Sequence, residues 1–191
     1  MKDFIFYLTL IVNIVLVGSL VITRLNPMFR VWPPPGRKSW QFLFTWILFI
    51  FSFLGILVIG IFDWDSLIIK TTLRFPIGGI LILAGAGLAF WGVKTLGIYA
   101  SQGLGGELIT EGPYRYTRNP QYVGDITIII GYIILSNSIL TLIVGLLGIL
   151  WFVLAPFTEE PWLQEQLGAA FDDYMLKVPR FLSIKGGKGT G

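Results

Sequence analysis

Long apolar stretches dominate this sequence and restrict what the chain can fold into. An α-helix needs about 20 apolar residues to cross the hydrocarbon core of a bilayer, which is about 30 Å thick. With 54% hydrophobic and only 13% charged residues, the composition indicates an integral membrane protein. Four stretches are long enough to be predicted as membrane-spanning helices: Phe4 to Ile22, Trp40 to Phe62, Pro76 to Val93 and Ile139 to Phe157.

A fifth, shorter apolar stretch runs from Tyr122 to Leu135. Only Ser136 to Ser138 separate it from the last long one, which predicts a tight antiparallel helical hairpin. The predicted fold is therefore all-α, a polytopic membrane helical bundle of about five transmembrane helices. After Pro161, apolar residues recur at helical spacing, which predicts an amphipathic C-terminal helix lying against one end of the bundle: Leu163, Leu167, Ala170, Phe171 and Tyr174.

The remaining segments are interpreted from local composition. The first stretch resembles a signal peptide, but Asp3 and the lack of an A-x-A site favour a retained helix over a cleaved one. The linker from Asn26 to Ser39 contains WPPPGRK, whose prolines cannot continue a helix, so we expect an extended connection with no further role. Residues 1–184 are interpreted as one domain, and residues 185–191 as a disordered tail.

Basic residues are unevenly divided between the two ends of the predicted helices. If the N-terminus lies outside, all but three of the 14 Lys and Arg residues fall on the inner side, the exceptions being Lys2, Lys70 and Arg74. Because Lys and Arg favour the cytoplasmic side, we predict an external N-terminus and a cytoplasmic C-terminus in the cell inner membrane or its equivalent. The basic residues form only short clusters, so nucleic acid is not an expected partner.

The sequence contains no cysteine and no histidine. This excludes disulfides, thiolate ligands and a cysteine nucleophile, and it removes the commonest general base and zinc ligand. We therefore predict no metal site. Any chemistry must depend on Asp, Glu, Arg, Lys, Tyr, Asn and backbone groups, or on a cofactor.

The stretch EGPYRYTRNPQYVGD, Glu111 to Asp125, concentrates polar residues just before the fifth apolar run. Gly112-Pro113 is a turn signal, and Asn119-Pro120 can begin the helix that follows. Its arginines, including Arg118, are site candidates, although interfacial cations and an aromatic belt would give the same pattern. Asp125 is interpreted as a first-turn carboxylate that complements the helix N-terminus, with a functional carboxylate as the alternative.

Two adjacent carboxylates, Glu159-Glu160, follow directly on the last long apolar run. At the C-terminal end of a helix they oppose the helix dipole and repel each other. This break of a local rule favours a functional role over a solvated helix end.

GAGLAFWG, from Gly85 to Gly92, places several small residues in the third predicted span. Small residues let helices approach closely in lipid, and packing is the preferred interpretation. The alternative is that a flat ligand approaches the backbone there.

Together these motifs resemble a known family. GPYRYTRNPQYVGD, followed after a helical hairpin by FTEEPWL and FDDYMLKVPRFL, is similar to the membrane methyltransferases that include isoprenylcysteine carboxyl methyltransferase and phosphatidylethanolamine N-methyltransferase. The resemblance spans about Leu96 to Leu182. It divides the chain into an N-terminal helical hairpin, residues 1–75, and a cofactor-binding half, residues 76–184.

The resemblance implies that S-adenosylmethionine binds at the cytoplasmic side, between the R-x-P-x-Y loop and the E-E motif. Arg118, Tyr122 and Glu159 are the implied catalytic residues. Asn119 stands where many relatives have His, and no arginine shortly precedes Glu159, which looks more like the phospholipid amine methyltransferases. The implied cofactor-binding residues are Gly85, Gly87, Arg118, Asn119, Pro120, Tyr122, Glu159 and Glu160.

The implied function is S-adenosylmethionine-dependent methyl transfer to a lipophilic or membrane-borne acceptor, either a phospholipid amine or an isoprenylcysteine-like carboxylate. Carboxylates, an arginine and aromatic faces suit the charges of this cofactor. Membrane lipid is the expected partner. A membrane sterol-type reductase and a non-catalytic lipid-binding subunit are the alternatives, and the sequence leaves the acceptor and the oligomeric state open.

Overall fold

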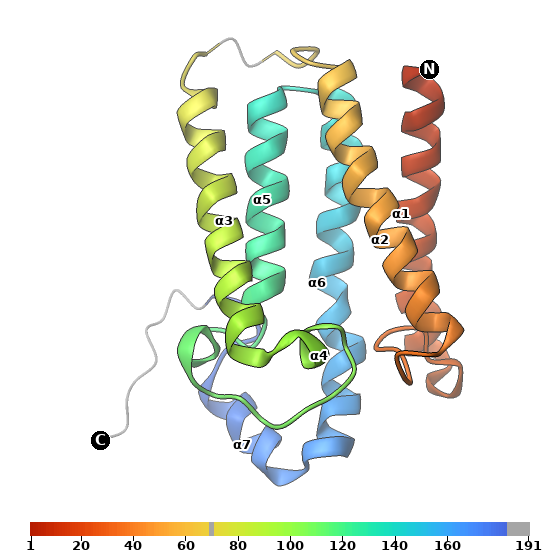
Figure 1. Cartoon of the computed structure of the whole chain (residues 1–191), viewed down its shortest axis with the longest axis vertical. Helices are drawn as coiled ribbons and strands as arrows, with labels where there is room; N and C mark the ends of the chain where they lie inside the picture. The colour runs from red at the N-terminus through yellow and green to blue at the C-terminus, as the bar shows by residue number, and fades with distance from the viewer. Residues whose placement is uncertain (69–70, 183–191) are drawn as a thin grey trace.

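The computed structural model describes residues 1–68 and 71–182. Within them the chain is all-helical, and its long helices run side by side (Figure 1). Four helices are long and apolar enough to cross a membrane, and α5 is a shorter apolar helix, so the prediction of a polytopic bundle is confirmed. The predicted tail, residues 185–191, lies outside the described residues. The five helices are α1 (Lys2–Leu25), α2 (Trp40–Phe62), α3 (Arg74–Leu96), α5 (Pro120–Ser136) and α6 (Ile139–Leu167).

The predicted hairpin between α5 and α6 is present, and local chemistry explains its tight turn. Asn137 ends α5 in the left-handed conformation, with φ of 49°, which Asn tolerates better than most residues. Ser138 then caps α6, because its Oγ accepts a hydrogen bond of 3.0 Å from the backbone N–H of Thr141. The two helices therefore reverse direction within two residues.

Small residues bring α3 against α5. A Cβ added to Gly85 would lie 2.6 Å from the carbonyl oxygen of Gly124, and one added to Gly131 would lie 2.9 Å from that of Gly78. Such spacing lets two backbones meet without side chains between them. The interpretation of Gly85 as a packing residue is confirmed.

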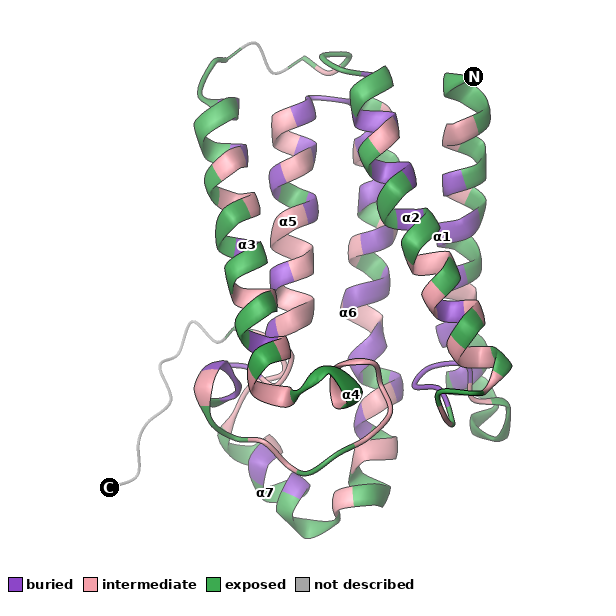
Figure 2. Ribbon diagram, in the orientation of Figure 1, coloured by how far each residue is buried: buried purple, intermediate pink, exposed green. Residues whose placement is uncertain are grey.

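Apolar residues on the outward faces of the long helices remain exposed (Figure 2). On α2, Ile50 and Leu54 are 56% and 55% exposed, and on α3 Leu83 is 75% exposed. Exposed apolar surface on this scale is unfavourable in water but suits the hydrocarbon of a bilayer.

A buried aspartate joins three segments at the end of the bundle that holds the N-terminus. Asp63 accepts hydrogen bonds from Lys2 Nζ at 3.0 Å, Ser66 Oγ at 2.6 Å, Ser138 Oγ at 2.8 Å and the backbone N–H of Leu140 at 3.2 Å. Burial acts to raise the pKa of Asp63, but these hydrogen bonds outweigh it and lower the pKa to about 2. The carboxylate therefore holds α1, α2 and the α5–α6 turn together.

The short elements gather at the opposite end (Figure 1). They are the α1–α2 linker with η1 (Pro27–Phe29), α4 (Ile98–Ser101), η2 (Gly112–Arg115) and α7 (Ala169–Lys177). Segments far apart in the sequence thus meet beneath one end of the bundle.

Three expectations about this end differ from the structure. The expected amphipathic helix after Pro161 is divided at Gly168, whose φ of +60° breaks it, so that its first part continues α6 and its second part is α7. Glu159 and Glu160 therefore lie inside α6 and not at its C-terminus, because the helix passes through Pro161 to Leu167.

The α1–α2 linker is also more than a connection, since Val31 and Trp32 are 3% exposed and Thr23 Oγ1 accepts a 3.0 Å hydrogen bond from the Val31 N–H.

Candidate active site

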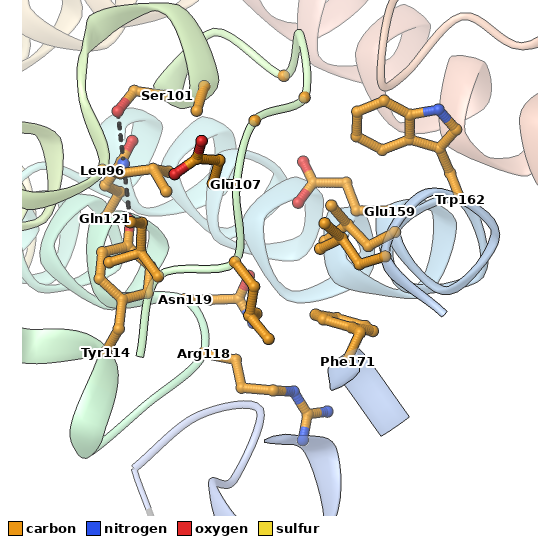
Figure 3. A pocket seen from close by; sticks show the side chains of 18 of the residues that line it. Leu96, Ser101, Glu107, Tyr114, Arg118, Asn119, Gln121, Glu159, Trp162 and Phe171 are labelled. Atoms are coloured by element: carbon orange, nitrogen blue, oxygen red, sulfur yellow. Dashed lines mark hydrogen bonds between the residues drawn. The ribbon is translucent and has the colours of Figure 1, made fainter. Parts of the chain in front are cut away.

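A cavity of about 130 Å³ opens among the short elements at this end of the bundle. Its walls come from the α1–α2 linker, the loop between α4 and η2, the start of α5, the last turns of α6, and α7 (Figure 3). Polar groups face it from several sides, among them Glu107 on the loop and Glu159 on α6. The cavity is therefore assembled from both halves of the chain.

Glu159 is held in this wall by two donors from distant elements. Tyr122 Oη, on α5, and Trp32 Nε1, in the linker, both donate hydrogen bonds to Glu159 Oε1. No hydrogen bond or ion pair joins Oε2 to another described residue. One oxygen thus fixes the side chain in the cavity wall, while the other has no protein partner among the described residues.

Its neighbour Glu160 has a different environment. It is 8% exposed and receives the guanidinium groups of two arginines. Arg118 Nη2 lies 2.6 Å from Oε1, Arg180 Nε lies 2.8 Å from Oε1, and Arg180 Nη2 also bonds to Oε2. The hydrogen bond to Glu160 raises the pKa of Arg180, as expected for a guanidinium beside a carboxylate. Glu160 is saturated by protein groups and does not line the cavity.

The loop of residues 117–119 holds the last turn of α7 and the segment that follows it. Arg118 Nη1 donates to the carbonyls of Met175 and Val178 at 3.1 and 2.7 Å, and its backbone N–H donates to Pro179 at 3.0 Å. Thr117 Oγ1 and Asn119 Nδ2 each donate to the Arg180 carbonyl at 3.0 Å. These bonds keep α7 against the bundle and so close one side of the cavity.

The ring of Tyr174 completes this closure. The residue is 6% exposed, and its Oη donates a 2.7 Å hydrogen bond to the Tyr114 carbonyl. Burial raises the pKa of Tyr174 to about 12, so the hydroxyl stays protonated and remains a donor.

A second cavity, of about 330 Å³, adjoins the first and is mostly aromatic. It is lined by Phe49, Trp151 and Phe152, and by Ile50 and Leu54 of α2, which are also exposed on the outside of the bundle. The cavity therefore opens sideways, beside α2, toward the surface that faces lipid. The residues that line both cavities are Trp32, Ser101, Gln121 and Tyr122.

Comparison with known proteins identifies the family. The phospholipid methyltransferase family model matches residues 73–170, which include Arg118, Tyr122 and Glu159. The chain belongs to this family. Within the phospholipid methyltransferase family match lie α3, α5 and α6, whereas α1 and α2 precede it. No solved structure gives a significant match.

Two curated relatives come from different branches of methyl transfer. Phosphatidylethanolamine N-methyltransferase B from Dictyostelium discoideum is 33% identical over 110 residues, covering 53% of this chain and 55% of that protein. Protein-S-isoprenylcysteine O-methyltransferase from Schizosaccharomyces pombe is 36% identical over 73 residues, covering 38% of this chain and 31% of that protein. The alignments thus span about half of the first relative and about a third of the second.

The structure brings four of the residues implied by the phospholipid methyltransferase motifs to the first cavity: Arg118, Asn119, Tyr122 and Glu159. Figure 3 shows the Arg118 guanidinium turned away from Glu159, which agrees with its bonds to Met175 in α7 and to Val178 just after it.

Four other implied residues are not among those that line the cavity: Gly85, Gly87, Pro120 and Glu160. Gly85 is occupied by the contact with α5, and Gly87 is exposed with nothing within 4 Å of a Cβ built on it. Pro120 is buried at the first position of α5, where its missing N–H is not needed. Glu160 is engaged by the two arginines. Gly85, Pro120 and Glu160 therefore contribute to packing and to the ion pairs of the fold, whereas Gly87 makes no such contact.

Sequence reasoning missed several cavity residues. Nothing local to WPPPGRK indicates that Trp32 meets Glu159, because the two are 127 residues apart. A signal was available for the loop of residues 103–106, since Gly103 and Gly105 adopt φ of +74° and +80° and the glycine-rich pattern predicts such a turn. A Cβ on Gly103 would approach the Trp32 ring to 3.0 Å, so glycine lets this loop lie against the indole.

Asp125 also differs from its prediction. Because α5 begins at Pro120, Asp125 lies beyond the first turn, which contains no acidic residue. The helix dipole acts within the first turn, so it does not account for this carboxylate. Asp125 lines the second cavity.

Proposed function

We propose that this protein transfers a methyl group from S-adenosylmethionine to a lipophilic acceptor. The observation that carries the proposal is the meeting of two cavities of different chemistry. The first opens at the end of the bundle and carries charged side chains such as Glu107 and Glu159 in its wall, whereas the second is mostly aromatic and opens toward lipid. Both include Trp32, Gln121 and Tyr122 in their walls. This arrangement would let a methyl donor that enters from water meet an acceptor that stays in lipid.

The first cavity suits the cofactor. S-adenosylmethionine carries an ammonium group, ribose hydroxyls, a carboxylate and a sulfonium cation. Glu159 Oε2 and the Glu107 carboxylate are acceptors for an ammonium or for hydroxyls, and the rings of Trp162 and Phe171 offer faces for a cation or a purine. The cofactor supplies an electrophilic methyl group when bound, and the protein mainly aligns the reactants.

The protein's own residues would position the reactants and exclude water from the cavity. Tyr122 and Trp32 hold Glu159 in one orientation, so the ligand-binding oxygen is fixed before a ligand arrives. The bonds from the 117–119 loop keep α7 over the cavity and limit solvent entry. Chemistry of this kind needs neither histidine nor cysteine, which the chain lacks.

We place this end of the bundle in the cytoplasm. It holds Arg24, Lys94 and Lys177 at the ends of their helices, whereas the other end holds Lys2 and Arg74. The positive-inside rule then gives an external N-terminus. A reporter fused to the N-terminus is expected to read as external, and a cytoplasmic reading would overturn the placement.

The direct test uses purified protein in lipid nanodiscs with methyl-labelled S-adenosylmethionine, followed by separation of labelled lipid, protein and volatile products. Wild-type protein is expected to bind the cofactor and to label a lipid-soluble acceptor. Glu159→Gln is expected to weaken cofactor binding roughly tenfold, whereas Glu165→Gln, an exposed change on the same helix, serves as the matched control. Binding of a reduced nicotinamide instead, or of neither cofactor, would overturn the proposal.

A further inference from the structure

The second cavity contains one carboxylate whose role the fold does not explain. Asp125 lies on α5 in the wall of this mostly apolar space and is partly buried. Across residues 1–68 and 71–182, no hydrogen bond or ion pair to it is found, and the helix N-terminus is too far away along α5 to stabilise it.

Such a position is unfavourable for an unpaired carboxylate. An ionised group facing an apolar space loses hydration, and ionisable residues at membrane depth normally pair with another charge. Arg118, which precedes it in the same motif, is already engaged with Glu160, and no salt bridge joins Asp125 to any cation within the described residues. The side chain thus lacks a cation from the protein, while the cavity has room for one from a ligand.

Asp125 is also well placed relative to the junction of the two cavities. Tyr122, which lines both, precedes it by three residues on the same helix, or about 4.5 Å along the axis. Glu159 lies on the cofactor side of Tyr122, and its bond to the Tyr122 hydroxyl marks that side. A group bound by Asp125 would therefore lie on the acceptor side of the junction, within reach of it.

We propose that Asp125 is the specificity-determining residue for the acceptor and selects a lipid with a cationic amine head group. This inference rests on the proposed function and makes it narrower. The carboxylate would accept charge-assisted hydrogen bonds from the ammonium and would take up the proton that the nitrogen must lose before its lone pair can bond to the methyl group. The apolar walls would contact the first part of the lipid chains. The same charge would disfavour an acceptor that ends in a carboxylate, because two like charges in a poorly hydrated cavity repel.

The test compares two acceptors with wild-type protein, Asp125→Asn and Asp125→Glu, all in phosphatidylcholine nanodiscs. The amine acceptor is phosphatidylethanolamine and the carboxylate acceptor is N-acetyl-S-farnesylcysteine. Initial rates are measured below saturation, and the affinity for S-adenosylmethionine is measured separately by calorimetry. Asp3→Asn, an exposed carboxylate on α1 at the other end of the bundle, is the matched control.

We expect wild-type protein to methylate the amine in preference to the carboxylate. Asp125→Asn is expected to lower amine methylation about tenfold or more with unchanged cofactor affinity, and to reduce the preference between acceptors. Asp125→Glu is expected to keep much of the amine activity because it keeps the charge. Asp3→Asn is expected to match wild type in every measurement.

Three results would separate the inference from the proposed function. If Asp125→Asn binds the cofactor and methylates the amine at the wild-type rate, the role of Asp125 is overturned but the proposed function is not. A wild-type preference for the carboxylate acceptor would overturn that role too, even if Asp125→Asn does not fold. Failure of wild-type protein to bind S-adenosylmethionine would instead overturn the proposed function.

Discussion

The adjacent carboxylates Glu159 and Glu160 should respond in opposite ways to the same substitution. Glu160→Gln is expected to destabilise the protein, because Arg118 and Arg180 would lose their shared counter-charge. Glu159→Gln is expected to spare stability and weaken cofactor binding, since one oxygen of Glu159 faces the cavity. The family motif alone implies that both residues bind the cofactor.

The size of the Glu160 effect follows from its surroundings. Removing one partner of a buried ion pair typically costs about 3 to 5 kcal/mol. Two features reduce this value here: the Arg180 side chain is 31% exposed, and glutamine still offers one hydrogen-bond acceptor. We therefore expect a loss of about 2 to 3 kcal/mol in unfolding free energy. By the scaling for domains of this size, this lowers the midpoint of thermal unfolding by roughly 5 to 10 °C.

The measurement can use the protein's own fluorescence, because the chain has seven tryptophans and no cysteine for thiol-reactive dyes. Thermal unfolding in detergent gives stability, and calorimetry at a temperature where both variants are folded gives cofactor affinity. The reasoning would be refuted if Glu160→Gln unfolded at the wild-type temperature, or if folded Glu160→Gln lost cofactor affinity as much as Glu159→Gln.

Three further predictions concern other parts of the molecule. Trp32→Phe keeps an aromatic ring but removes the N–H that holds Glu159, so calorimetry on the folded variant should show weaker cofactor binding, by roughly threefold to tenfold. The smaller ring should also lower stability, because Trp32 is buried. Gly85→Ala should destabilise the protein by about 1 to 3 kcal/mol, because the added Cβ would meet the α5 backbone. Gly87 faces open space, so Gly87→Ala should be neutral or slightly stabilising, and equal unfolding midpoints for the two variants would contradict this packing. Because its pKa is lowered, Asp63 should contribute about 2 kcal/mol to the free energy of unfolding above pH 4, and this contribution should be lost as the pH falls from about 4 to about 2. Asp63→Asn should flatten this part of the plot of stability against pH, and an unchanged plot would contradict the role given to Asp63.

Much of the site could be located from sequence, but the roles within it could not. Arg118, Asn119, Tyr122 and Glu159 were found from two motifs, and the structure places all four at the cavity. The motif does not show that Arg118 points to the segment after α7, because the direction of a side chain depends on which acceptors the folded chain brings near it.

The sequence by itself determined the membrane helices and their order, because length and apolar composition decide whether a segment crosses a bilayer and depend only on nearby residues. The Ser-Asn-Ser turn between α5 and α6 likewise depends only on nearby residues. Only the tertiary structure decided which polar groups meet. It brought Trp32 to Glu159 from 127 residues away and paired Glu160 with two arginines. It also placed Asp125 in an apolar wall. These outcomes depend on how the helices pack and rotate against one another, since in lipid close packing and buried hydrogen bonds, more than hydropathy, fix those contacts.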